Sequence, residues 1–187
     1  MKTLATVLLF CGFVLGQSQS NNNSHLAIRP GAQDANEQHI AKEVRHELLM
    51  LPYYSIFDDL EFSVNGNTVT LLGAVTNPTL KKDADSAVKH IEGVSEVNNQ
   101  IKVLPPSPMD DQIRRRVARA VADQDGLYRY FQGAVGSIHI IVDNGHVTLK
   151  GVVDNQADDT MAKLAANQVP GVFSVKDDLQ VANSSNK

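Results

Sequence analysis

Apolar residues recur along this chain at helical spacing in some stretches and at every second position in others. The first helical stretch, 40–51, places its apolar residues on one face, as an amphipathic helix does. Two alternating runs, 60–64 and 69–75, follow with a turn between them, which predicts a β-hairpin. A second helical stretch starts at Asn77, and a last alternating run covers 97–103. The predicted order is therefore helix, strand, strand, helix, strand.

The same order occurs a second time because the chain contains an internal duplication. Residues 64–75 align without a gap on 142–153, and residues 93–103 align on 171–181, both at an offset of 78. The first helices align at an offset of 73, so the second copy has a loop five residues longer after its first helix. Two segments held at one constant offset identify a tandem repeat.

We predict an α/β (α+β) fold made of two tandem α-β-β-α-β modules. In each module the hairpin pairs antiparallel, and the β-α-β crossover favours a right-handed parallel connection. This arrangement gives a small three-stranded mixed sheet with two helices on one face. The first module covers residues 36–104 and the second covers 110–183, joined by a proline-stiffened linker, 105–109. Because this linker is short, we expect the two modules to pack against each other.

The N-terminal residues 1–16 indicate a secretory signal peptide. Lys2 precedes an apolar run of twelve residues, which is too short to cross a bilayer. Residues 17–35 form a polar, non-periodic leader. We therefore expect a cleaved signal and a periplasmic or otherwise exported protein. Acylation of Cys11, as in a lipoprotein, is disfavoured because Phe10 stands where lipoprotein signals have a small residue.

Composition limits the function classes that are open to this chain. It has 187 residues, of which 42% are hydrophobic and 20% charged, and its net charge is −4. That acidic balance argues against a nucleic-acid partner bound by a broadly basic surface. A single cysteine excludes an intrachain disulfide and a cysteine-based metal site. Since the sequence has no motif for an activated nucleophile or a phosphate-cradling loop, we expect no catalytic residue, cofactor or small-molecule substrate.

Turn and core residues of the same types recur in both copies, and the core positions do so at the offset of 78. In the first copy these are Asn65, Gly66, Val69, Leu71, Gly73, Val75, Gly93, Val94, Val97, Asn99, Ile101 and Val103. In the second copy they are Asn144, Gly145, Val147, Leu149, Gly151, Val153, Gly171, Val172, Val175, Leu179 and Val181. This pattern resembles the BON domain, a bacterial family named for osmotically inducible and nodulation proteins. The resemblance implies a module of the cell envelope that binds phospholipid surfaces or partner proteins and catalyses no reaction.

Basic and aromatic residues gather near the start of the second copy, and we predict that they bind an anionic phospholipid surface. The predicted lipid-binding residues are Arg114, Arg115, Arg116, Arg119, Tyr128, Tyr130 and Phe131. Guanidinium groups bind phosphate in a bidentate manner, and Tyr and Phe suit the depth of lipid headgroups. The alternative interpretation is a solvated helix face beside core aromatic residues.

Two further groups of polar residues have simpler explanations. His39, Glu43 and His46 lie on one side of the first helix and could share a zinc ion, but the second copy does not repeat them. We therefore interpret them as a solvated helix face and expect no metal. Four acidic pairs are also expected to be solvated: Asp58-Asp59, Asp110-Asp111, Asp158-Asp159 and Asp177-Asp178.

The alternative function is protein binding. A periplasmic adaptor or chaperone-like stress protein would use the open face of a sheet or a strand edge, where unpaired backbone groups accept another strand. Partners are then envelope proteins in place of, or in addition to, lipid.

Overall fold

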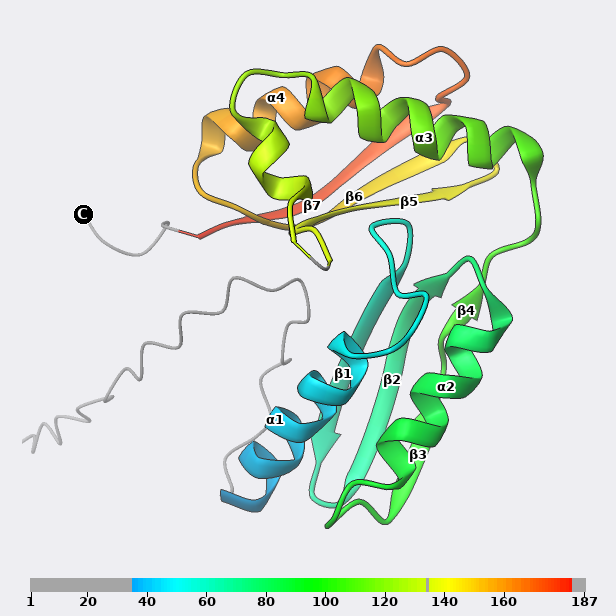
Figure 1. Cartoon of the computed structure of the whole chain (residues 1–187), viewed down its shortest axis with the longest axis vertical. Coiled ribbons are helices and arrows are strands. Elements are labelled where there is room, and N and C mark those ends of the chain that lie inside the picture. The colour runs from blue at the N-terminus through cyan, green and yellow to red at the C-terminus, as the bar shows by residue number, and fades with distance from the viewer. Residues whose placement is uncertain (1–34, 134, 183–187) are drawn as a thin grey trace, which may run out of the picture.

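The computed structural model describes residues 35–133 and 135–182, which divide into two α/β domains (Figure 1). Domain 1 contains α1 (Ala35–Leu49), β1 (Asp59–Asn65), β2 (Thr68–Val75), α2 (Pro78–Lys89), β3 (Glu96–Asn99) and β4 (Lys102–Val103). Domain 2 contains α3 (Pro108–Ala122), the 3-10 helix η1 (Leu127–Phe131), β5 (Ile138–Asp143), β6 (His146–Val153), α4 (Gln156–Asn167) and β7 (Ser174–Val181). The predicted α-β-β-α-β order is confirmed in both copies. The predicted signal peptide and the leader up to residue 34 lie outside the described residues.

Each domain has the mixed sheet that the repeat predicts. The hairpins β1-β2 and β5-β6 are antiparallel, whereas β3 pairs parallel with β2 and β7 pairs parallel with β6. The third strand of domain 1 is interrupted after Asn99 and resumes as β4. The Asn99 amide donates to the carbonyl of Lys81 on α2 at 2.9 Å, a bond that the carboxylate of the aligned Asp177 cannot donate. The aligned strand β7 is continuous.

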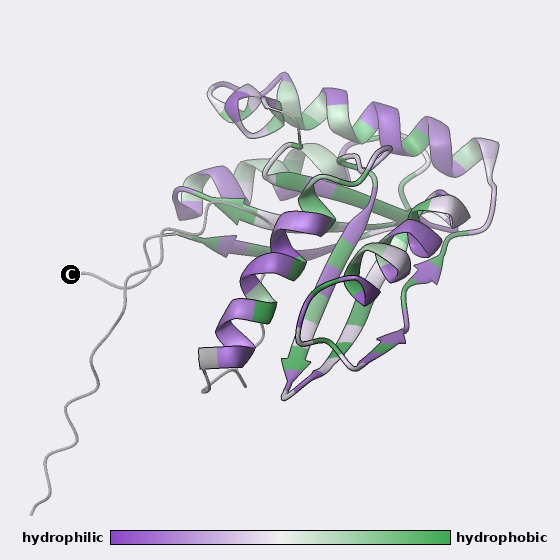
Figure 2. Ribbon diagram, turned by 60° about the horizontal axis from the view of Figure 1, so that its bottom comes forward, coloured by the Kyte–Doolittle hydropathy of each residue, from purple (hydrophilic) through white to green (hydrophobic). Residues whose placement is uncertain are grey.

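The helices of each domain cover one face of its sheet and bury an apolar stripe there (Figure 2). In domain 1 the fully buried residues of α1 and α2 include Ile40, Leu48 and Leu80, which pack with Phe62 of β1 and Leu71 of β2. Domain 2 builds an equivalent core from α3, α4, η1 and its own sheet. Each large apolar side chain removed from water in this way contributes about 1.5–3 kcal/mol.

A glycine in the second hairpin strand of each domain lets the neighbouring strand approach closely. Gly73 and Gly151 both have positive φ angles, 105° and 123°. A Cβ atom at Gly73 would lie 2.2 Å from the Asp59 carbonyl oxygen, and at Gly151 it would lie 1.9 Å from that of Ser137. These positions therefore require glycine on both conformational and steric grounds.

The expectation that the paired acids are solvated is wrong for most of them. Five of the eight are buried, namely Asp58, Asp59, Asp110, Asp158 and Asp159. Asp58 illustrates the reason, because it accepts hydrogen bonds from the Ser55 hydroxyl at 2.7 Å and from the Thr76 backbone N–H at 2.7 Å. A carboxylate leaves water at little cost only where such donors replace its hydration. Asp58 thereby holds the loop before β1 in place.

A carboxylate also ties each hairpin turn to the first helix of its domain. Glu37 accepts from the Gly66 N–H at 2.5 Å. Asp110, which aligns with Glu37, accepts from the N–H groups of Asn144 at 3.1 Å and Gly145 at 2.8 Å. Both repeats therefore use the same device to set the helix against the hairpin.

The two domains pack together through the outer face of the second sheet. Both faces of β5 are buried, because His139 and Ile141 lie on the face opposite the helices and yet are shielded from water. The Ile140 N–H donates to the Ile56 carbonyl at 2.7 Å, and His139 Nδ1 lies 2.6 Å from the Asp58 carbonyl. A carbonyl only accepts, so Nδ1 carries the hydrogen. The loop after α1 thus docks on β5 (Figure 1).

Lys150 on β6 adds an ionic contact between the domains. Its ammonium group lies 2.6 Å from Asp59 and 2.6 Å from Glu61, both on β1. Burial alone would lower the pKa of Lys150, but the hydrogen bonds to these two carboxylates outweigh it and raise the pKa. A second pair, Lys102 with Asp143, joins the domains near the linker at 2.5 Å. The domain interface therefore combines backbone hydrogen bonds with charge pairs.

Candidate lipid-binding surface

Helix α3 divides the predicted arginines into exposed and buried residues. Arg115, Arg116 and Arg119 are exposed, on the side of the helix opposite its buried stripe. Arg114 is only 4% exposed, and its guanidinium donates to Asp111 at 2.5 Å and to the Val142 carbonyl at 2.6 Å. Arg114 therefore anchors α3 to β5 and cannot reach a ligand outside the domain.

The aromatic residues of the long loop divide in the same way. Tyr128 is 63% exposed, whereas Tyr130 is 5% exposed and Phe131 packs partly against the domain 2 core. The Tyr130 hydroxyl donates to the Asp158 carboxylate at 2.5 Å and accepts from the Asp154 N–H at 2.9 Å. Burial and the bond to Asp158 raise the pKa of Tyr130 to about 12. Tyr130 fastens the loop to the start of α4.

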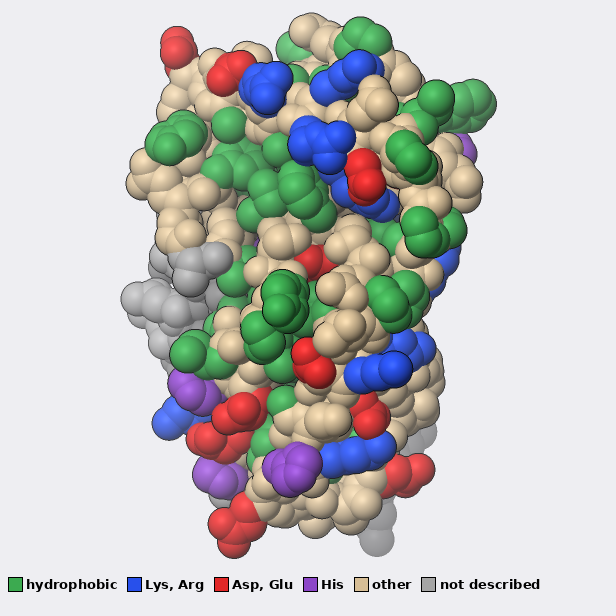
Figure 3. Space-filling view, turned by 45° about the vertical axis from the view of Figure 1, so that its right-hand side comes forward, with side chains coloured by type: hydrophobic (Ala, Val, Ile, Leu, Met, Phe, Trp, Pro, Cys, Tyr) green, Lys and Arg blue, Asp and Glu red, His purple; other side chains and the backbone are tan. Residues whose placement is uncertain are grey.

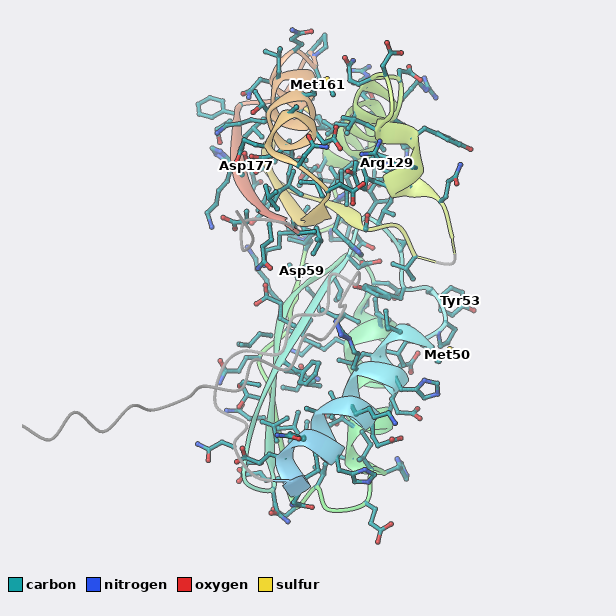
Figure 4. The ribbon with its side chains drawn as sticks, turned by 90° about the vertical axis from the view of Figure 1, so that its left-hand side faces the viewer. Met50, Tyr53, Asp59, Arg129, Met161 and Asp177 are labelled. Atoms are coloured by element: carbon teal, nitrogen blue, oxygen red, sulfur yellow. The ribbon has the colours of Figure 1, made fainter. Side chains whose placement is uncertain are left out.

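Arg129, a residue that the sequence interpretation did not single out, completes this cluster. Its guanidinium donates to Tyr130 Oη at 2.8 Å, pairs with Asp158 at 2.5 Å and lies 4.6 Å above the Tyr130 ring. Figure 4 labels Arg129 beside the helices of domain 2. In domain 1 the residue aligned with Asp158 is the core residue Leu80, so only the second copy has this cluster.

We call the exposed Arg115, Arg116 and Arg119 of α3, together with the exposed Tyr128 of η1, the basic face. Helix η1 packs against α3, which places Tyr128 and the arginines on neighbouring elements. Figure 3 shows the basic side chains over domain 2 with apolar side chains beside them. Among residues 35–133 and 135–182, Arg115 and Arg119 have no carboxylate within ion-pair distance. Their positive charge is therefore available to a ligand.

A groove between α3 and α4 adjoins the basic face. Its volume is about 420 Å³, and its lining comprises Arg116, Arg119, Ala120, Asp123, Gln124, Ala165, Gln168, Val169 and Pro170. Arg116 donates only weakly, to the Gln112 side chain at 3.4 Å and to the Pro170 carbonyl at 3.5 Å. The α4 side of this groove was not predicted, because it lies about fifty residues from the arginines in sequence.

The corresponding groove in domain 1, between α1 and α2, has a different lining. Its volume is about 640 Å³, and it is lined by His39, Glu43, Glu47, Ala87, His90, Ile91 and Glu92. In the part of the chain that the structure describes, no three His, Cys, Asp or Glu side chains are arranged to hold a metal ion. His39 and His46 are exposed on α1.

Large apolar side chains are also exposed outside domain 2. Met50 and Tyr53 project from the end of α1 and the loop after it, and Figure 4 shows them on the same side of the molecule. Tyr53 has a φ angle of 69°, which is rare for a residue with a side chain.

Within the described ranges, no helix is both long and apolar enough to cross a membrane.

The sequence is similar to known proteins over almost its whole length. The osmotically-inducible protein Y of Escherichia coli (strain K12) is 24% identical over 192 residues, covering 96% of this chain and 94% of its own length. Among solved structures, the C-terminal domain of CdsD, the structural protein of the type III secretion system of Chlamydia trachomatis, matches at 13% identity with a TM-score of 0.30. That match covers 75% of this chain and 96% of the other. The BON domain pattern matches twice, at residues 36–105 and 109–183. The chain therefore belongs to the BON domain family and carries two BON domains in tandem.

Proposed function

We propose that this protein is a non-enzymatic component of the cell envelope that associates reversibly with anionic phospholipid surfaces through domain 2. The observation that carries the proposal is the basic face, where Arg115 and Arg119 are exposed and lack carboxylate partners among the described residues. Such a cluster is unexpected in a chain whose net charge is −4. The name of the Escherichia coli relative supports a role in the response to osmotic stress.

The expected affinity is low, because the contributing residues are few. Each arginine near an anionic surface contributes about 1 kcal/mol, so three contribute about 3 kcal/mol. On the affinity scale this is weaker than about 1 mM, and Tyr128 must add apolar contact for measurable binding. The acidic residues of domain 1 oppose binding only weakly, since charges beyond a Debye length of about 10 Å are screened at 0.1 M salt.

Arg114, Tyr130 and Phe131 have supporting roles in this proposal. Arg114 holds α3 against β5, and Tyr130 holds the loop that presents Tyr128. The proposed lipid contacts are therefore Arg115, Arg116, Arg119 and Tyr128. We further propose export to the periplasm, where the predicted signal peptide would send the chain and where such a surface would meet membrane lipid.

Co-sedimentation with liposomes tests the proposal through a double charge reversal. Arg115→Glu with Arg119→Glu should abolish association of the mature chain with anionic liposomes. The matched control is Lys42→Glu with Lys82→Glu, which makes the same charge change at exposed positions of domain 1. If both double variants bind equally less, only net charge matters, and the proposed surface is wrong.

Protein binding is the second candidate function, and one observation favours it. Strand β7 is an edge strand of eight residues, and Phe173 immediately before it is 81% exposed. The face of β5 opposite the helices, in contrast, is covered by domain 1. An adaptor would therefore bind its partner through the β7 edge. Salt-resistant recovery of one defined envelope protein with the immobilised chain would favour this function over lipid binding.

A further inference from the structure

The two helix-pair grooves occupy equivalent places in the repeat but carry opposite charge. Glu43 of the α1–α2 groove aligns with Arg116 of the α3–α4 groove, and Glu47 aligns with Ala120. Just after the second helix of each pair, Glu92 aligns with Pro170. The α1–α2 groove thus has three carboxylates and no Lys or Arg in its lining, whereas the α3–α4 groove has two arginines and one carboxylate.

The apolar strip along the groove, in contrast, is similar in both domains. Ala87 aligns with Ala165, and Ile91 aligns with Val169. Both grooves therefore offer a small apolar strip between polar rims, and the rims carry opposite charge. Surfaces of opposite charge favour contact with each other and disfavour contact with their own kind.

Among the described residues, the contact between the two domains uses neither groove. The domain interface uses Ile56, Asp58 and Asp59 of domain 1 with His139 and Lys150 of domain 2. None of these residues lines either groove. Since the helices cover the sheet faces remote from that interface, each groove can contact a second molecule while the two domains remain packed (Figure 1).

We propose that the α3–α4 groove of one molecule binds the α1–α2 groove region of a second copy of this chain. In this contact Arg116 and Arg119 face Glu43 and Glu47 of the other copy. Because unlike surfaces are joined, the contact is heterologous, so it can repeat and give open chains of molecules. Exposed ion pairs are weak, and the association should therefore be concentration-dependent and sensitive to salt.

Sedimentation velocity of the lipid-free mature chain tests this inference independently of membrane binding. The weight-average mass should rise with protein concentration up to about 1 mM at low salt. The rise should disappear at about 0.5 M salt, where charges are screened within a few ångströms. A parent chain that stays monomeric over this range would contradict the proposal.

Charge-reversed variants make the test specific to the two grooves. Arg116→Glu with Arg119→Glu makes both grooves acidic, and Glu43→Arg with Glu47→Arg makes both basic, so each variant alone should be monomeric. An equimolar mixture should recover the association, because acidic and basic grooves then meet again. Lys42→Glu, at an exposed position of α1 outside the groove lining, should keep the parent's association. Failure of the mixture to associate would overturn the proposal, whereas its recovery also shows that both variants are folded.

Discussion

The substitution Tyr130→Phe separates the structural role of the long loop from its predicted role in lipid binding. It removes one oxygen atom and keeps the ring that packs in the domain 2 core. That oxygen donates to Asp158 at 2.5 Å and accepts from the Arg129 guanidinium at 2.8 Å and the Asp154 N–H at 2.9 Å. The variant therefore loses three hydrogen bonds at a buried site, although Asp158 keeps Arg129 and Asn155 as donors.

The expected loss in the free energy of unfolding is about 2 kcal/mol, because a hydrogen bond to a charged group contributes about 1.5–3 kcal/mol. The pH dependence provides a second signature. The pKa of Tyr130 is raised by burial and by the bond to Asp158, to about 12 in the folded state, against about 10 in the unfolded chain. A raised folded pKa means that this stability is fully present below pH 10 and is lost between pH 10 and about 12. The stabilities of parent and variant should converge over that window.

Urea unfolding followed by far-UV circular dichroism measures both effects. Tyr128→Phe is the matched control, since its ring is exposed and its stability should change by less than about 0.5 kcal/mol. Liposome association of the folded Tyr130→Phe variant should equal that of the parent. A loss below about 0.5 kcal/mol in Tyr130→Phe, or a selective loss of lipid binding, would refute the structural assignment of Tyr130.

Three further substitutions test other parts of the fold. Asp177→Asn places in domain 2 the residue that Asn99 provides in domain 1. Burial, and then the Asp177 charge, raise the pKa of Asp159, so the parent loses stability as the pH rises above about 4. The variant should therefore have the higher thermal midpoint at pH 7. An equal or lower midpoint by calorimetry would contradict this. Gly151→Ala should lower the free energy of unfolding by more than about 3 kcal/mol, since its Cβ would lie 1.9 Å from the Ser137 carbonyl oxygen. A smaller loss in a urea titration would count against the close approach of the two strands. Lys150→Met leaves Asp59 and Glu61 without their shared ammonium group and should cost about 3 kcal/mol and enlarge the radius of gyration in X-ray scattering. The control Lys176→Met, whose partner Asp178 is on the same strand, should change neither quantity.

The architecture could be predicted from the sequence because the same order of helical and alternating apolar stretches occurs in both copies. The alternation of residues 60–75 defines the hairpin, and its recurrence at 138–153 excludes coincidence. The division of the third strand after Asn99 could not be predicted, and it coincides with a contact between the Asn99 amide and a carbonyl on α2. Local periodicity contains no information about such a contact.

The candidate site was harder to predict, because charge and aromatic character do not determine exposure. Arg114 and Arg115 are neighbours in sequence, yet only Arg114 is turned toward β5 and buried. Tyr130 is likewise one residue away from an exposed position but is fixed by Asp158, twenty-eight residues further along the chain. At 100° per residue, Arg115, Arg116 and Arg119 lie opposite the apolar stripe of α3, so the exposure of these three side chains follows from helical periodicity.

The central proposal is that the basic face of domain 2 binds anionic lipid, and the bound fraction of the mature chain on two kinds of liposome measures it most directly. Sedimentation with anionic and with neutral liposomes, each at low salt and at about 0.5 M salt, separates electrostatic attraction from apolar adsorption. We predict binding to anionic liposomes at low salt, its loss at high salt, and no binding to neutral liposomes under either condition. Equal binding to both lipids, or none to the anionic one at low salt, would contradict the proposal.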